Sequence, residues 1–352
     1  MPDDTTSFTR TGHSDYIFAL AFSPDSTYLA SASRDTTVRI WRMHSHNVGA
    51  RFIASSSDGD RESLEEGAIN RAPTSINNNI DWKSSEEDAI NRAPTSIDNK
   101  IEQYIVYHEH VHPLLSVAWS PDGKFIASGD TGGIIHIWEA ETGKTILTYH
   151  GHIRFVRSIA WSPDGLYIAS GGDYGDSTVQ VWEALTGKLI YTHHRQYRIF
   201  SVSWEPGGQH IASCSFDGSV QLWEPFTGKV ILSYSSHTGP IYTTAWSPDS
   251  KYIASGGQDA TIQIWEATTG KTVCIYKGHT EAVKALSWSP DSKYIVSGGD
   301  DTTVQVWEAI TGKCIIFYVG YKKWIRAVAW STDGKYIAFA CDKNVWIVTN
   351  TP

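Results

Sequence analysis

The chain has 352 residues, of which 29 are Lys or Arg and 38 are Asp or Glu, so its formal net charge is −9. Hydrophobic residues make up 41% of the chain and charged residues 19%, which excludes a protein too polar to bury a core. The sequence contains no run of the ~18 apolar residues that a membrane helix needs, and its acidic total disfavours nucleic-acid binding, which requires a basic surface.

Tryptophan recurs along the chain with a regular spacing, and only Trp82 and Trp324 of the 15 fall outside the pattern. One set closes strand-like stretches, and a second set lies in Trp-Ser-Pro-Asp-like text, where Phe22 takes the first position. Both sets repeat about every 42 residues, which predicts seven repeats. In chain order the first set is Trp41, Trp138, Trp182, Trp223, Trp265, Trp307 and Trp346, and the second is Trp119, Trp161, Trp204, Trp246, Trp288 and Trp330.

A polar insertion at about residues 42–100 separates the first repeat from the second. It is rich in Ser, Asn and Asp, and residues 65–76 recur almost unchanged as residues 86–97. The duplication is too short for another repeat. We expect a flexible loop between the third and fourth strands of the first repeat, because long polar loops seldom order themselves. The alternative is a pair of short linear motifs that a partner recognises.

Each repeat reads as four short strands. In the sixth, apolar and polar residues alternate over 283–288, 294–297, 304–307 and 313–318, with Pro, Gly and Asp in the turns between them. Such segments indicate antiparallel β-structure. A four-stranded sheet cannot bury both faces alone, so the copies must pack face to face around an axis. We therefore predict an all-β fold, a single seven-bladed propeller over residues 1–352.

The repeats resemble the WD-repeat family of β-propellers. Gly-His pairs at 151–152 and 278–279 match one family element, and Trp-Glu at 307–308 stands where the family often has Trp-Asp. The resemblance covers essentially the whole chain outside the insertion. It implies that the N-terminal segment around residues 5–12 supplies the fourth strand of the last blade and closes the ring.

Four repeats carry a His, a Ser, an Asp and a Trp at matching positions. These types resemble a hydrolase triad, but triads are recognised by geometry and role, and one active site would not be repeated four times. The resemblance implies instead a buried hydrogen-bond network that ties the turns of each blade together. The proposed network residues are His13, Ser31, Asp35 and Trp41; His152, Ser170, Asp176 and Trp182; His237, Ser255, Asp259 and Trp265; and His279, Ser297, Asp301 and Trp307.

The other three repeats break this pattern. Gly132 takes the Asp position in the second repeat, the His of the fourth shifts to His194, and the seventh has Tyr321 for His and Ala338 for Ser. One interpretation is that blades near the ring closure drift, because terminal repeats are usually atypical. The other is that local departures mark a functional sector.

The resemblance also implies that partners dock on the face formed by the fourth-to-first and second-to-third strand turns. The alignment places Gly175 of the third repeat and Cys341 of the seventh there, among many aromatic and basic residues. Tyr, Trp and Arg dominate binding hot spots, which predicts a docking face for acidic or phosphorylated peptides. The alternative is that the rings pack inward between blades. The predicted docking residues are Tyr16, Phe18, Arg34, Phe155, Arg157, Arg198, Phe200, Phe216, Tyr242, Lys284, Trp324 and Arg326.

These patterns favour a non-enzymatic scaffold that binds other proteins or peptides, as a cytoplasmic monomer without cofactor or membrane attachment. Two alternatives stay open: an enzyme with a pocket at the propeller axis, and a sensor module for a separate effector. The axial enzyme lacks a non-repeating cluster of Asp, Glu, His or Cys outside the network. Stacking of single-stranded nucleic acid on the aromatic and basic face is disfavoured by the net charge.

The cysteines and a His-rich segment suggest no metal site. Cys214, Cys274, Cys314 and Cys341 lie in different repeats without a Cys-x-x-Cys pair, so neither a zinc site nor a disulfide framework is expected. Free thiols suit a reducing cytoplasm. In His-Glu-His-Val-His at 108–112, strand alternation sends neighbouring side chains to opposite faces, whereas a metal needs converging ligands.

Overall fold

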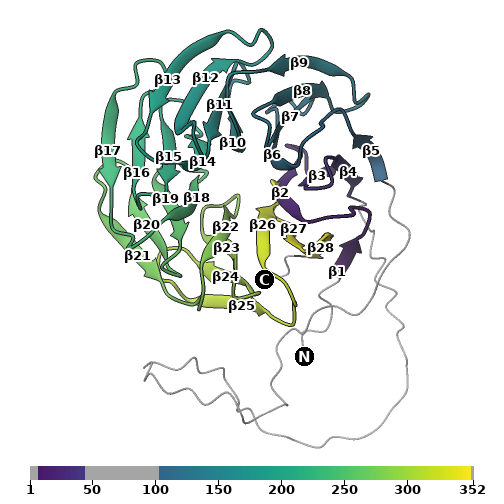
Figure 1. Ribbon diagram of the computed structural model, residues 1–352. Coiled ribbons are helices and arrows are strands. Elements are labelled where there is room, and N and C mark those ends of the chain that lie inside the picture. Colours follow the sequence, from purple (N-terminus) through teal and green to yellow (C-terminus); the bar gives the residue numbers. More distant parts are fainter. Residues whose placement is uncertain (1–6, 44–102, 350–352) are drawn as a thin grey trace, which may run out of the picture. The chain divides into compact units, whose positions relative to one another are not determined.

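Seven four-stranded sheets form a ring around a central axis (Figure 1). The computed structural model describes residues 7–43 and 103–349, and those residues contain β-strands and turns without a helix. In six of the seven sheets the strands follow the chain in order from the axis outward. The predicted all-β, seven-bladed propeller is confirmed. The predicted insertion lies outside the described residues, apart from its boundary.

Blades 1 to 3 contain the first twelve strands after β1. Blade 1 consists of β2 (Ile17–Phe22), β3 (Tyr28–Ser33), β4 (Val38–Arg42) and β5 (Gln103–Tyr107). Blade 2 consists of β6 (Leu114–Trp119), β7 (Phe125–Asp130), β8 (Ile135–Glu139) and β9 (Thr145–Tyr149). Blade 3 consists of β10 (Val156–Trp161), β11 (Tyr167–Gly172), β12 (Thr178–Glu183) and β13 (Leu189–His194).

Blades 4 to 6 repeat the arrangement. Blade 4 consists of β14 (Ile199–Trp204), β15 (Ile211–Ser215), β16 (Val220–Trp223) and β17 (Val230–Tyr234). Blade 5 consists of β18 (Ile241–Trp246), β19 (Tyr252–Gly257), β20 (Ile262–Glu266) and β21 (Thr272–Tyr276). Blade 6 consists of β22 (Val283–Trp288), β23 (Tyr294–Gly299), β24 (Val304–Glu308) and β25 (Cys314–Tyr318).

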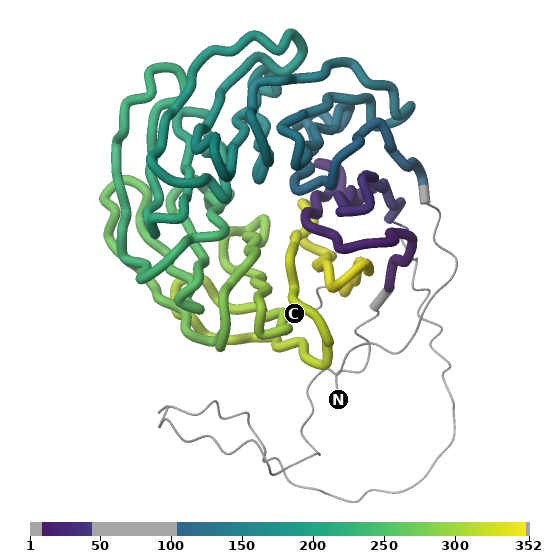
Figure 2. Tube along the Cα trace, in the orientation of Figure 1, coloured from purple at the N-terminus to yellow at the C-terminus, as the bar shows by residue number. Residues whose placement is uncertain are grey.

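Blade 7 joins the two ends of the described chain. It contains β26 (Ile325–Trp330), β27 (Tyr336–Cys341) and β28 (Asn344–Thr349), and its outer strand is β1 (Ser7–Arg10). Strand β1 pairs antiparallel with β28, with Arg10 opposite Val345, and Figure 2 shows the purple start beside the yellow end. This confirms the predicted closure by the N-terminal segment.

The core lies between neighbouring blades. At the junction of blades 1 and 2, Ile40 and Tyr107 pack against Leu114, Ile126 and Trp138 in one buried cluster. The ring of Tyr107 stacks parallel on Trp138 with centroids 4.4 Å apart, and equivalent stacks recur around the ring. The repeated tryptophans therefore serve inter-blade packing, which gives each blade its second buried face.

Candidate functional site

One side chain from each blade lines a cavity on the axis. The cavity has a volume of about 260 Å³ and opens among Phe18, Leu115, Arg157, Phe200, Tyr242, Lys284 and Arg326. Each is the second residue of its blade's first strand. Six of the seven are predicted docking residues, and Leu115 completes the ring.

A β-bulge places each of these side chains. In blade 3, Val156 pairs with Gly172 and Ser158 pairs with Gly171, so Arg157 has no partner in the ladder. The same register shift occurs in the first strand of every blade. A bulge bends its strand and redirects a side chain, and here it repeats with the ring. The axial residues are thus presented on rigid strands rather than on loops.

Two of the three axial cations are neutralised by acids on the second-to-third strand turns. Arg157 Nε lies 2.6 Å from Oδ2 of Asp173, which is 1% exposed. Lys284 Nζ lies 3.2 Å from Asp300 Oδ2 and 3.6 Å from the centre of the Tyr242 ring. Burial lowers the pKa of Lys284 despite the opposing effect of Asp300, and the nearby cations lower it further. The charges of Arg157 and Lys284 are therefore largely balanced by carboxylates beside the axial cavity.

Arg326 differs from the other axial cations. Within residues 7–43 and 103–349, no carboxylate lies within ion-pair distance of its guanidinium group. Its Cζ instead lies 5.3 Å from the ring centre of Tyr16, 5.1 Å from that of Phe18 and 4.9 Å from that of Trp324. Burial lowers the pKa of Arg326, partly offset by Asp300. The group is thus a cation that lies between aromatic rings and has no ion-pair contact among the described residues.

The outer part of the face continues this chemistry. Arg198 lies over two rings, 5.0 Å from the centre of Tyr174 and 4.9 Å from that of Phe216. Arg34 Nε lies 3.7 Å from Asp15 Oδ2, and both are exposed enough for water to screen the pair. All twelve predicted docking residues are exposed or half-buried, including Trp324 at 49%. Inward packing of the rings is therefore incomplete at every position.

Two positions of this face were aligned wrongly from sequence. Asp173, not Gly175, occupies the third blade's position, because its N–H bonds to Phe155 O just as Asp300 N–H bonds to Ala282 O. The turn in blade 3 is two residues longer, so spacing misplaced it. In blade 7, Cys341 pairs with Ile325 inside the ladder, so the next residue, Asp342, takes the turn position.

The His-Ser-Asp-Trp residues form hydrogen-bond networks inside the blades. His13 Nδ1 lies 2.8 Å from Asp35 Oδ2, its Nε2 lies 2.8 Å from Ser31 Oγ, and Trp41 Nε1–H donates to Ser31 Oγ. The equivalent bonds form in blades 3 and 6. In blade 5, His237 contacts Ser255 and Asp259, but Trp265 Nε1 has no acceptor among the described residues.

The serines of these networks are not accessible to solvent. The four serines, among them Ser31 and Ser297, are fully buried. Burial alone would raise the pKa of Asp35, but hydrogen bonds from His13 and Thr37 outweigh it and hold the pKa far below its usual value. A buried Ser that already contacts a His and a Trp cannot meet a substrate carbonyl. The geometry is that of blade bracing.

Blades 2 and 4 form the corresponding hydrogen-bond network with other residues. In blade 2, Asp130 Oδ2 accepts from His110 Nδ1 at 2.9 Å. The prediction that Gly132 replaces the acid in this blade was therefore wrong. Asp130 is the last residue of β7 and pairs with Leu114, and from this position its carboxylate reaches His110. In blade 4, His194 is exposed, and Arg195 instead donates to Ser215 at 3.0 Å and to Ser219 at 2.6 Å.

Blade 7 replaces the polar network by an aromatic cluster. Phe339, not Ala338, takes the Ser position, because it pairs with Val328 as Ser297 pairs with Leu286. Trp346 lies opposite Phe339, two residues before the usual Trp position. Tyr321 packs edge-on against both rings, with centroids 5.1 and 5.5 Å away. The shortened turn before β28 caused the misalignment, and positions two apart share one face of a strand.

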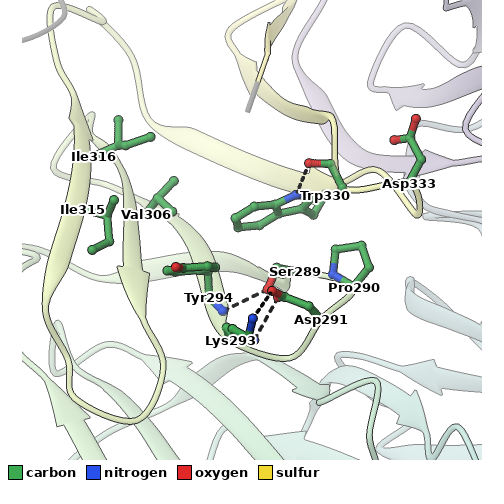
Figure 3. Close-up of a pocket in the computed structure, with 11 residues that line it drawn as sticks. Ser289, Pro290, Asp291, Lys293, Tyr294, Val306, Ile315, Ile316, Trp330 and Asp333 are labelled. Atoms are coloured by element: carbon green, nitrogen blue, oxygen red, sulfur yellow. Dashed lines mark hydrogen bonds and ion pairs between the residues drawn. The ribbon is translucent and has the colours of Figure 1, made fainter. Parts of the chain in front are cut away.

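A second cavity, of about 420 Å³, lies between blades 6 and 7. Tyr294 and Trp330 flank it, and Val306, Ile315 and Ile316 lie along one side (Figure 3). The matching cavity between blades 1 and 2 is smaller, about 280 Å³, and residues 140–141 in the third-to-fourth strand turn of blade 2 also line it. The described part of blade 7 has no such turn, since β28 ends at Thr349.

The described residues show few other reactive groups. Among them, no three His, Cys, Asp or Glu side chains converge as a metal site would require. The chain's described part also has no helix long and apolar enough to cross a membrane. The four cysteines are free thiols, of which Cys314 is exposed, and burial raises the pKa of Cys214 to about 12.

Comparison with known proteins links the geometry to a family. The model of the WD domain, G-beta repeat, matches residues 5–42, 102–139, 143–183, 187–224, 228–266, 270–308 and 312–348. An uncharacterized WD repeat-containing protein of Nostoc sp. is 53% identical over 45 residues, which cover 13% of this chain and 3% of that protein. The mouse F-box-like/WD repeat-containing protein TBL1X is 26% identical over 133 residues, covering 38% of this chain and 25% of that protein. WD repeat-containing protein 82 of Drosophila melanogaster is 24% identical over 170 residues, covering 38% and 54%. The matches thus span from 3% to about half of these relatives' own lengths.

Proposed function

The chain belongs to the WD-repeat family of β-propellers, and on that premise we propose that it is a non-enzymatic scaffold that docks partner proteins or peptides on its axial face. Propellers of this family generally serve protein interactions. The observation that carries the proposal is the ring of seven axial residues, one per blade, with three cations and three aromatic rings. Acidic segments are the favoured partners because the ring carries uncompensated positive charge.

The composition of this face supports docking. Aromatic and Arg side chains contribute most of the free energy at protein interfaces, because they bury a large area and keep a polar or charged end. Trp324 and Phe216 are 49% and 42% exposed, respectively, at the rim of the face. The bulged strands hold the axial side chains in place before a partner arrives, which lowers the entropic cost of binding.

An axial enzyme is less well supported. The seven residues that line the axial cavity include no His, Cys, Ser, Asp or Glu, the hydroxyl of Tyr242 donates to Gln258 Oε1, and Lys284 is paired with Asp300. General acid–base or nucleophilic catalysis would need such a group within reach of substrate. A sensor that passes a bound partner to an effector would use the same docking face, so it is a variant of the proposal.

We also place the protein in the cytoplasm as a monomer. Free thiols, with Cys314 exposed, suit a reducing compartment. Pairing of β1 with β28 supplies the fourth strand of blade 7, so the edge of β28 is covered within the chain and is not available to a second copy.

Affinity capture from native lysate tests the docking face. The face variant is Trp324→Ala/Arg326→Glu, and the matched control is Leu166→Ala/Lys293→Glu, which alters the same charge and a similar exposed apolar side chain on first-to-second strand turns at the opposite end. We expect proteins bound by wild type and control to be lost from the face variant, with unchanged β-sheet circular dichroism. Equal capture by all three proteins would contradict the proposal.

A further inference from the structure

A lateral pocket adjoins the axial cavity on the same face. It has a volume of about 260 Å³ and is lined by Tyr16, Thr302, Lys322, Lys323, Trp324 and Arg326. Arg326 comes from β26, and the other lining residues come from the β1–β2, β23–β24 and β25–β26 connections. Arg326 lines both cavities, so the pocket is a side branch of the docking face.

The pocket concentrates positive charge. Its lining includes three cations and no Asp or Glu. Lys322 and Lys323 are exposed, and neither forms an ion pair with a described carboxylate. Arg157 and Lys284, in contrast, are paired with Asp173 and Asp300. On the axial face, the cations without an ion-pair contact therefore lie mainly in this lateral pocket.

The donors are held by the surrounding structure. The guanidinium group of Arg326 is fixed between the rings of Tyr16, Phe18 and Trp324. The Lys322–Lys323 turn is anchored by Cys341, whose Sγ–H donates to Lys323 O at 3.4 Å. The pocket thus brings together a guanidinium group held between rings, two lysine side chains on an anchored turn and the Thr302 hydroxyl, which are donor types that bind anions.

We propose that this pocket binds a phosphoserine or phosphothreonine side chain of a docked peptide; this rests on the proposed function of the face. A phosphoryl group carries about two negative charges and three acceptor oxygens, whereas a carboxylate carries one charge and two oxygens. Three cations and a hydroxyl match the phosphoryl group better, and an Arg fork binds it through two parallel hydrogen bonds. The exposed ring of Trp324 would then pack against the residue next to the phosphorylated one.

A phosphorylated peptide fits better than a membrane or a polynucleotide. Those partners need a broad basic surface that follows many phosphates. The chain as a whole carries a net charge of −9, and the basic lining is confined to one pocket. A single phosphoryl group on a peptide meets this geometry without exposing the acidic remainder of the protein to other phosphates.

Fluorescence anisotropy with the full-length chain tests the pocket. The probes are labelled degenerate peptide pools with a fixed central phosphoserine, phosphothreonine, or the unphosphorylated residue. The pocket variant is Lys322→Glu/Lys323→Glu, and its charge-matched control is Lys293→Glu/Lys335→Glu on the opposite turns. We expect phosphorylated pools to bind wild type and control at least about tenfold more tightly than unphosphorylated pools. The pocket variant should lose that difference.

Three outcomes would overturn the inference. They are equal binding of both kinds of pool, an unchanged phosphate preference in the pocket variant, and tighter binding of phosphatidylserine vesicles or a single-stranded oligonucleotide through the two lysines. Phosphatase treatment of the lysate separates this inference from the proposed function. Capture that survives phosphatase yet still requires Trp324 and Arg326 refutes the phosphate pocket alone. Capture that requires neither residue refutes both.

Discussion

Acidification is expected to weaken the junction of blades 1 and 2 through one histidine. His136, in β8, is 9% exposed, and its Nδ1 lies 2.6 Å from the hydroxyl of Tyr107 in β5. Its ring stacks on His110 at 4.1 Å, with Asp130 and His150 as the other ionisable groups nearby. Burial, reinforced by His110, lowers the pKa of His136 to about 4.

The lowered pKa of His136 determines the direction of the stability change and the pH range over which it occurs. Below the unfolded pKa of 6.5, the unfolded chain takes up a proton at His136 and the folded chain does not, so stability falls as pH falls toward 4. One pKa unit corresponds to about 1.4 kcal/mol, so this residue alone removes about 3 kcal/mol over the whole window and about 2 kcal/mol by pH 5. The carboxylates of the blade networks have pKa values lowered from 3.8, so their protonation reduces folding stability mainly at lower pH.

The chain supplies the matched variant for this test. At three other junctions the same hydroxyl position donates to a glutamine, as Tyr276 does to Gln305 at 2.6 Å. His136→Gln should therefore keep the hydrogen bond and remove the titration. Urea unfolding followed by tryptophan fluorescence should show wild type losing about 2 kcal/mol more than the variant between pH 7 and 5. Equal losses in the two proteins would refute the reasoning.

Four further results follow from the same structure and are measured by urea unfolding unless stated. Ser297→Ala leaves His279 Nε2 and Trp307 Nε1–H unpaired in a fully buried site, so it should destabilise by about 2–4 kcal/mol; a loss below about 0.5 kcal/mol would contradict the network. Arg157→Ala removes the 2.6 Å partner of buried Asp173 and leaves only Arg198, 3.9 Å away, so it should cost about 2–3 kcal/mol, whereas Arg157→Ala/Asp173→Asn should recover part of that loss. Tyr276→Phe should cost about 1 kcal/mol, but Tyr318→Phe should be nearly neutral because the Tyr318 hydroxyl has no partner among the described residues; equal costs would be inconsistent with this account. Deletion of residues 44–98 should leave thermal unfolding unchanged within a few degrees while abolishing capture of one partner if the duplication is a binding motif, and loss of folding would contradict both readings of the insertion.

The ring was predictable because one period governs nearly the whole chain. The tryptophan spacing gave the number of blades, and period-two alternation gave the strands. The networks of blades 1, 3 and 6 also followed from spacing, because their turns keep each acid at a position from which it reaches the His. Patterns that every repeat shares can therefore be recognised from the sequence alone.

Prediction failed where a turn changed length or another side chain took over a role. The longer turn of blade 3 hid Asp173, and the shorter turn of blade 7 moved Trp346 two places along its strand. Asp130 and Arg195 complete the networks of blades 2 and 4 from unexpected positions. The bulges that aim the axial residues depend on strand register, which spacing does not reveal.

Site-specific photocrosslinking tests the docking face most directly. A photoreactive phenylalanine analogue replaces Trp324 or Phe216 on the face, or Leu166, which is 61% exposed on a turn at the opposite end of blade 3. After irradiation in native lysate, we expect covalent adducts with a partner from the two face positions and none from Leu166. Adducts that form only at Leu166, or at no position, would contradict the assignment of partner binding to the axial face.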